Sequence, residues 1–213
     1  MKKVCTYIAV IVLFGGFAFT ERLHADDNEQ VGRELLEQLR THFNEGLILY
    51  ADMRHEFYDA YTEESEVTDG EIWISDAMYR IKVTHQEVLV DGLLSRVYNE
   101  PQNKLLISEY IREEDDFAPS RFFSDSDDLF MISEVQTEDE LIYITLLSED
   151  PFEIFQKVRL VLTSEARPVS VYAIDQMDNE FHTRFIDAEF IPLSDDHFKP
   201  NFPESAEVVD LRN

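Results

Sequence analysis

The sequence predicts a mainly β (α+β) fold, in which an unclosed, strongly curved antiparallel β-sheet (a half-barrel) carries helices on its concave face. Two observations predict it. One segment near the N-terminus has helical periodicity, and from Leu47 onward short apolar runs alternate with polar residues at hairpin spacing. Because helices do not alternate with strands, a parallel α/β sheet is disfavoured. A curved sheet that does not close has an inner face too large for one helix to cover, so a pocket is expected there.

Residues 1–25 have the pattern of a secretory signal peptide, and residues 26–213 are expected to form a single domain. A short basic head precedes a long apolar run, and cleavage is expected near Ala25. An uncleaved membrane anchor is the alternative, because the run approaches the length needed to span a bilayer. Cleavage would remove Cys5, the only cysteine, so the exported domain would be held together without disulfides.

The chain is strongly acidic, with a formal net charge of −27. Such a surface repels phosphate backbones and anionic headgroups, which excludes nucleic acid as a partner. The acidic residues form either a solvated shell or a negative field that steers basic partners.

The helix is expected in the segment NEQVGRELLEQLRTHFNEG, which begins at Asn28. Its apolar residues recur every four positions, as the inner face of an amphipathic helix requires. They are Val31, Leu35, Leu39 and Phe43. Gly46 stands where a helix commonly ends.

Strands are then expected at hairpin spacing along the rest of the chain. The candidates are residues 47–58, 71–75, 78–84, 87–90, 93–99, 104–110, 130–136, 141–147, 157–163, 169–175 and 182–190. Turn formers separate many of them, at Asp69-Gly70, Asp91-Gly92, Asn99 to Pro101 and Asp178-Asn179. Asp91-Gly92 is the strongest hairpin signal. A short second helix is expected from Ala118 to Phe123, opening at Pro119.

Catalytic and metal-binding patterns are missing from the sequence. Adjacent acidic pairs are expected by chance among 45 carboxylates, and the six histidines form no H-E-x-x-H pair. No serine lies in a G-x-S-x-G setting, and there is no glycine-rich phosphate loop. We therefore expect neither enzymatic activity nor a cofactor or metal.

Five segments occur in an order that resembles a known family. They are DGEIWISDAMYRIKV, VLVDGLLSRVYN, FAPSRFF, LLSEDPFEIFQKVRLVLTSEARPVSVYAIDQMDN and FKPNFPESAEVVDL. Over about residues 29–211 the chain resembles the outer-membrane lipoprotein carrier protein family, LolA. The matching positions are Trp73, Tyr79-Arg80, Asp91-Gly92, Tyr98, Pro119, Leu147, Pro151, Asp175 and Phe198. The chain departs from the family in the turn Ser75-Asp76-Ala77, where the family often has a basic residue and a proline.

The resemblance implies a half-barrel whose apolar concave face is capped by helices. Its cavity would hold the acyl chains of a lipoprotein that crosses the periplasm. The partners implied are an inner-membrane lipoprotein-releasing ABC complex and an outer-membrane acceptor. The resemblance also implies a monomer that is a carrier and not an enzyme.

The candidate lipid-binding residues are apolar side chains on the faces expected to point inward. They are Leu35, Leu36 and Leu39 on the helix, Trp73, Tyr79, Ile81 and Val83 on strands, and Phe122 and Phe123, a movable plug, on the second helical segment. Alternation places Tyr79, Ile81 and Val83 on one face, but ordinary core packing would give the same pattern. Two other functions therefore stay open: a periplasmic lipid-binding or lipid-sensing protein of the same fold with different cargo, and an exported structural module with a filled core.

Overall fold

The computed structural model describes residues 17–123 and 129–212, with the side chains of the first helix described from Asn28 onward. The predicted signal peptide therefore lies mostly outside the described residues. Within the described part of the chain, no helix has both the length and the hydropathy that crossing a bilayer requires.

The long helix is α1 (Phe17–Asn44), which contains the predicted amphipathic segment. Leu35, Leu39 and Phe43 are buried on its inner face, as the four-residue spacing predicts, and the neighbouring Leu36 is buried with them. The expectation is wrong for Val31, which is 41% exposed one turn before Leu35. The helix ends as expected at Gly46, which has a φ of +79° and donates its N–H to the carbonyl oxygen of Phe43 at 3.0 Å.

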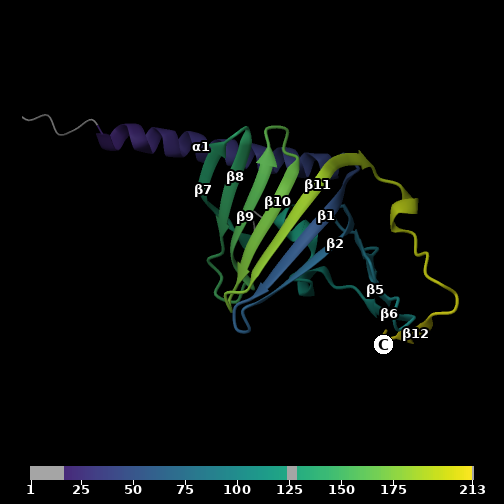
Figure 1. Ribbon diagram of the computed structural model, residues 1–213. Coiled ribbons are helices and arrows are strands. Elements are labelled where there is room, and N and C mark those ends of the chain that lie inside the picture. Colours follow the sequence, from purple (N-terminus) through teal and green to yellow (C-terminus); the bar gives the residue numbers. More distant parts are fainter. Residues whose placement is uncertain (1–16, 124–128, 213) are drawn as a thin grey trace, which may run out of the picture.

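In the part of the chain that the structure describes, twelve strands form one sheet (Figure 1). They are β1 (Leu47–Asp59), β2 (Glu64–Ile74), β3 (Tyr79–Val83), β4 (Gln86–Val90), β5 (Leu94–Asn99), β6 (Lys104–Glu109), β7 (Met131–Glu138), β8 (Leu141–Leu147), β9 (Phe155–Thr163), β10 (Pro168–Asp175), β11 (Glu180–Pro192) and β12 (Glu207–Asp210). Their order is β12-β6-β5-β4-β3-β2-β1-β11-β10-β9-β8-β7. All neighbours are antiparallel except β12 and β6, which run parallel.

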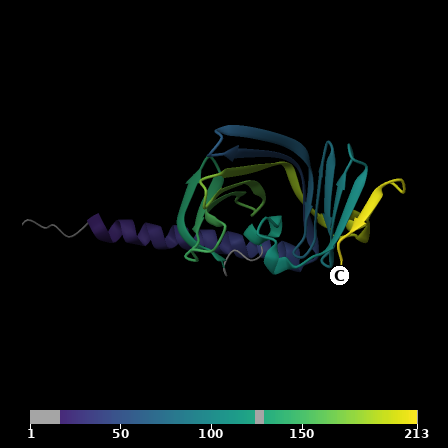
Figure 2. The same cartoon turned by 90° about the horizontal axis from the view of Figure 1, so that it is seen from below.

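The sheet curves but does not close, because its edge strands β12 and β7 do not pair with each other. Figure 2 shows it as an arch, with α1 lying across the open side. The predicted fold class, an unclosed half-barrel with an N-terminal helix, is confirmed. The second helix is confirmed as the short 3₁₀ helix η2 (Pro119–Phe122), which follows η1 (Arg112–Glu114).

One predicted turn is wrong. Asp69-Gly70 lies inside β2, where Gly70 pairs with Met53 on β1 and Val83 on β3. A Cβ at Gly70 would collide with the carbonyl oxygen of Lys82, so glycine here allows two strands to approach closely. The turn at Asp91-Gly92 is confirmed, and Asp91 Oδ1 accepts backbone N–H bonds that close it.

Apolar residues pack on both faces of the sheet. On the concave side the buried leucines of α1 belong to one cluster with Leu49, Ile74 and many residues of β7 to β11. On the convex side Ile48 and Leu89 pack with Phe198 of η3 (Asp195–Phe198). The C-terminal segment that carries η3 leaves β11 and runs outside the sheet to β12 (Figure 1). The convex face is thus covered near β1 and β4, whereas the concave face is larger than α1 alone can cover.

Candidate functional site

A cavity of about 350 Å³ lies on the concave face of the sheet. The register of the strands explains its wall. Met53 on β1 lies opposite Phe185 on β11, and Ile72 on β2 lies opposite Ile81 on β3, so each pair points to the same side. Val88 on β4 continues the wall beyond Ile81.

The wall is almost entirely apolar. Met, Ile, Val, Ala, Pro and Phe make up most of it, and none of the lining residues that the structure describes is Asp, Glu, Lys or Arg. The polar exceptions are His55, Thr68, Gln86 and Thr183. A concave, mainly apolar site with a few polar groups is the usual form of a small-molecule pocket.

Phenylalanines crowd one side of the cavity. Phe155 is the central member of this group. The centroid of its ring lies 5.5 Å from that of Phe117, 5.4 Å from that of Phe122 and 5.3 Å from that of Phe181. These edge-to-face contacts are favourable aromatic geometries. Phe117 is 57% exposed although it lines the cavity, so the cavity reaches the surface beside it.

Residues 112–123, which we call the cover segment, close the cavity on its open side. They include η1 and η2 and contribute Phe117, Pro119, Phe122 and Phe123 to the wall. In Figure 2 this segment lies inside the arch of the sheet.

Polar contacts hold the first half of the cover segment against β3 and against the turn that precedes β3. The hydroxyl of Tyr79 donates to Asp115 Oδ2 at 2.8 Å, and Arg112 lies 3.4 Å from Asp76. Burial, together with the hydrogen bond to Asp115, raises the pKa of the Tyr79 hydroxyl, so it remains a donor at neutral pH. Asp76 belongs to the turn Ser75-Asp76-Ala77, and its carboxylate pairs with Arg112 of the cover segment.

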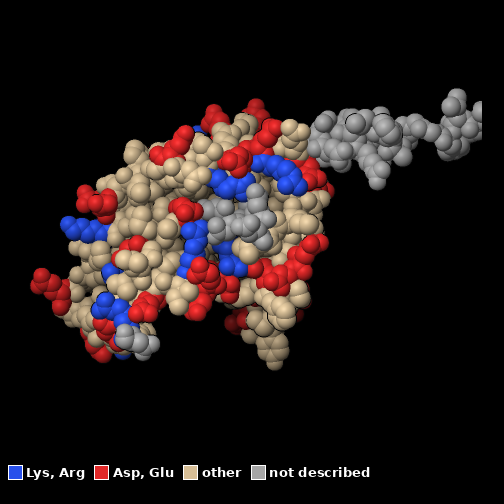
Figure 3. Space-filling model, turned by 180° about the vertical axis from the view of Figure 1, so that it is seen from behind, with Lys and Arg blue, Asp and Glu red and all other residues tan. Residues whose placement is uncertain are grey.

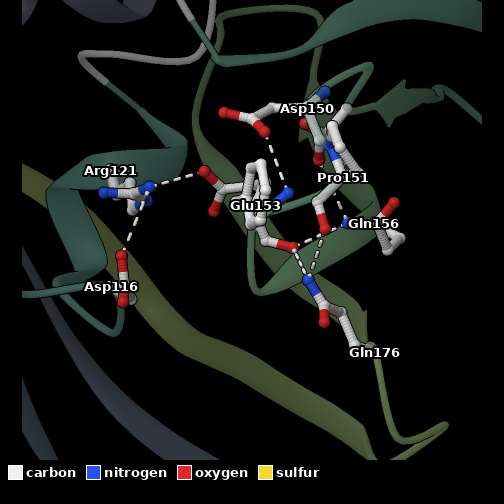
Figure 4. Close-up of polar contacts among 9 residues, drawn as sticks. Asp116, Arg121, Asp150, Pro151, Glu153, Gln156 and Gln176 are labelled. Carbon is white, nitrogen blue, oxygen red and sulfur yellow. Dashed lines mark hydrogen bonds and ion pairs between the residues drawn. The ribbon is translucent and has the colours of Figure 1, made fainter.

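A buried ion pair holds the second half of the cover segment in place (Figure 4). Arg121 of η2 lies 2.6 Å from Glu153 in the loop between β8 and β9, and 3.5 Å from Asp116. The side chains of Arg121 and Glu153 are 13% and 6% exposed. Gln176 fixes the same loop by donating to the carbonyl oxygens of Pro151 and Glu153, both at 2.9 Å.

The structure brings together four of the nine candidate lipid-binding residues on the cavity wall: Ile81, Val83, Phe122 and Phe123. The helix residues Leu35, Leu36 and Leu39 are buried in the surrounding apolar core but do not line the cavity.

The other two candidates also lie off the cavity wall. Tyr79 packs with Val90 and Ala118 beside it. Trp73 faces the convex side, because it alternates with Ile72, and packs there under Arg80 at 5.7 Å.

Sequence reasoning missed the polar lining residues. His55 follows Leu49, Ala51 and Met53 in strict alternation along β1, which was a signal that it points inward. In the structure His55 Nδ1 lies 2.9 Å from Thr183 Oγ1. Burial lowers the pKa of His55, so its imidazole is neutral at pH 7.

Acidic side chains are spread over the outer surface. On the face seen in Figure 3 they are interspersed with fewer basic ones, whereas the described residues of the cavity wall carry no formal charge. Among the described residues, no group of three or more His, Cys, Asp or Glu is placed to hold a metal ion.

No protein-family model matches the chain, and no curated protein matches it in sequence. In structure it is similar to an uncharacterized conserved protein from Thermus thermophilus, with a TM-score of 0.56 and 13% identity over 84% of this chain and 98% of that one. It is also similar to a LolA superfamily protein from Nitrosomonas europaea, with a TM-score of 0.45 and 13% identity over 79% of this chain and 97% of that one. A putative outer membrane lipoprotein-sorting protein domain from Vibrio parahaemolyticus has a TM-score of 0.43 and 11% identity over 82% of this chain and 97% of that one.

The likeness to the Thermus protein shows the fold. Fold and cavity together define a class: an unclosed half-barrel with an apolar internal pocket beneath a cover segment. An unclosed half-barrel of this kind is the architecture that the sequence predicts.

Proposed function

We propose that this protein is a periplasmic carrier that binds acyl chains of lipoproteins in the concave cavity and takes them from an inner-membrane releasing complex to the outer membrane. The observation that carries the proposal is the wall of the cavity, which is mainly apolar and, among the described residues, free of formal charge in a strongly acidic chain. Each buried methylene gains about 0.8 kcal/mol, so a chain of about twelve carbons gains roughly 10 kcal/mol on leaving water.

Transport also needs release, and the cover segment supports it. The segment closes the cavity with Phe122 and Phe123, and the contacts of Tyr79 with Asp115 and of Arg121 with Glu153 hold it against the sheet, so release requires these contacts to open. The predicted signal peptide, residues 1–25, supports a location outside the cytoplasm. No catalytic group is needed for this role, and none is proposed.

The size of the cavity favours a second candidate function. About 350 Å³ is at the lower end of ligand pockets, which measure roughly 300–1,000 Å³, and suits one acyl chain better than the two or three chains of a lipoprotein. A periplasmic lipid-binding or lipid-sensing protein with single-chain cargo fits this volume as it stands. A lipoprotein carrier requires the cover segment to move outward. The cavity argues against a structural module with a filled core.

Purification from the native envelope tests the proposal. The mature protein is isolated without detergent, and co-purifying molecules are identified by mass spectrometry. Recovery of acylated protein supports the lipoprotein carrier, and recovery of a single-chain lipid supports the second candidate. Protein that carries no acyl compound and takes up no fluorescent fatty-acyl probe would overturn both.

A further inference from the structure

Three polar side chains form a row across the cavity wall. His55 on β1 lies opposite Thr183 on β11 and Thr68 on β2, so the three point to the same side of three adjacent strands. The next row toward α1 contains Met53 and Phe185, which are buried and apolar. The cavity therefore has an apolar part and, across its middle, a band of hydrogen-bonding groups.

Several groups of this band have no partner in the described part of the protein. His55 Nδ1 contacts Thr183 Oγ1 at 2.9 Å, and this contact orients the ring. Nε2 of the same ring has no hydrogen bond to any described residue, and neither has the Thr68 hydroxyl nor the side-chain amide of the nearby Gln86. Unpartnered donors and acceptors on an apolar wall are the groups that orient a bound ligand.

The charges around the row select against an anionic ligand. Among the lining residues that the structure describes, there is no Lys or Arg that could pair with a carboxylate or phosphate. The acid whose charge acts on His55 is Glu66. It lies on β2 opposite Phe57, one row beyond the row of His55 and Thr68 on the side away from Met53. An anion at the row would lose its hydration without gaining a cation, and it would be repelled by Glu66.

We propose that the row formed by Thr183, His55 and Thr68 binds an uncharged polar head, such as a hydroxyl, ester or amide, at the end of an acyl chain that lies in the apolar part of the cavity. The neutral imidazole can donate through Nε2 when Nδ1 accepts from the Thr183 hydroxyl, or accept through Nε2 when Nδ1 donates to it, and the Thr68 hydroxyl can do both. This inference rests on the proposed function, because it names the head group of the acyl compound that the cavity accepts.

A comparison of head groups on the unmodified protein tests the proposal. A monoacylglycerol and the fatty acid of equal chain length each displace a fluorescent fatty-acyl probe at pH 8, where the carboxylate is ionised. We expect the monoacylglycerol to compete about tenfold more strongly, which corresponds to one or two net hydrogen bonds. Equal competition would overturn the inference and leave the proposed function standing, whereas failure of every acyl compound to bind would overturn the function itself.

A double variant identifies the row as the cause. Thr68→Val with Thr183→Val removes both hydroxyls and keeps the β-branched shape that suits a strand. It should weaken monoacylglycerol binding about five- to tenfold and leave fatty acid binding unchanged. Thr137→Val, on the edge strand β7 and outside the cavity wall, is the matched control. A double variant that is folded by circular dichroism and keeps the full preference would contradict the assignment.

A third experiment distinguishes the two possible sources of an uncharged head group, a lipoprotein anchor and a free neutral lipid. A synthetic peptide with an S-diacylglyceryl cysteine at its N-terminus presents the ester groups of a lipoprotein anchor. Competition by this peptide, lost in the double variant, would assign the head to lipoproteins. Competition by the monoacylglycerol alone would assign it to free neutral lipids.

Discussion

Arg121 and Glu153 form a 2.6 Å ion pair between η2 and the loop joining β8 to β9, and both side chains are nearly inaccessible to solvent. The pair connects the cover segment to the sheet immediately next to Phe122, which lines the cavity. Breaking a buried pair leaves an uncompensated charge, so this contact has more effect on stability than the exposed pairs of the surface.

Glu153→Gln should therefore loosen the cover segment and destabilise the protein. We expect a loss of about 2–3 kcal/mol in urea unfolding, because Asp116 at 3.5 Å compensates Arg121 only in part. Uptake of an acyl probe should become faster. Glu165→Gln, which removes the exposed partner of Arg167, is the control and should cost about 1 kcal/mol or less. Equal effects of the two substitutions would show that the buried pair has no special role.

Ile81→Glu should abolish uptake of the acyl probe while the protein stays folded. Ile81 is only partly buried and lies on the cavity wall, so a carboxylate there can reach the open space, but it makes that space unfavourable for hydrocarbon. We expect binding at least about tenfold weaker. Leu93→Glu places the same group at an exposed turn and should bind normally. Global unfolding of Ile81→Glu in circular dichroism would show that Ile81 is core.

Gly70→Ala should destabilise the sheet by about 1–3 kcal/mol in urea unfolding, because its Cβ would meet the backbone carbonyl of Lys82, which cannot move aside as a side chain can. Gly46→Ala is a useful comparison. A Cβ at Gly46 would meet no atom within 4 Å, so the expected loss of about 1–2 kcal/mol in the free energy of unfolding comes only from the positive φ. A stable Gly70→Ala protein would mean that β2 and β3 lie further apart than the structure places them.

Stability should depend on pH through His55. Its pKa in the folded protein is below 6.5, so its contribution to the free energy of unfolding is complete above pH 6.5. The contribution decreases as the pH falls from 6.5 through the folded pKa, because the unfolded chain takes up the proton first. The slope cannot exceed about 1.4 kcal/mol per pH unit for one proton.

His55→Gln isolates this effect, since His182 and the acidic residues remain in both proteins. Between pH 7.5 and 5.5 the urea midpoint of the unmodified protein should fall more than that of His55→Gln. Parallel pH profiles of the two proteins would show that burial does not perturb His55.

Local patterns could be predicted from the sequence because they depend on neighbouring residues. The leucines of α1 recur with helical spacing, and Ile81 and Val83 alternate along β3, so their buried or inward positions follow from periodicity alone. Asp91-Gly92 was predicted as a turn because its residues favour that conformation in most contexts.

Long-range pairing could not be predicted in the same way. Gly70 carries a turn signal, but its role depends on β3, which approaches it from later in the chain. β12 was not predicted, because its four residues pair with β6 about a hundred positions earlier. Trp73 was assigned to the cavity from its apolar character, but alternation with Ile72 directs it to the other face. The polar row likewise depends on strands β1 and β11, which are distant in sequence.

A crystal structure with a brominated acyl probe tests the central claim most directly, which is that the concave cavity accepts hydrocarbon. We predict an anomalous bromine peak inside the cavity, within contact distance of Ile81, Val83 or Phe185, with the cover segment closed over it or displaced. A cavity filled by the protein's own side chains, with bromine only on the outer surface, would contradict the account.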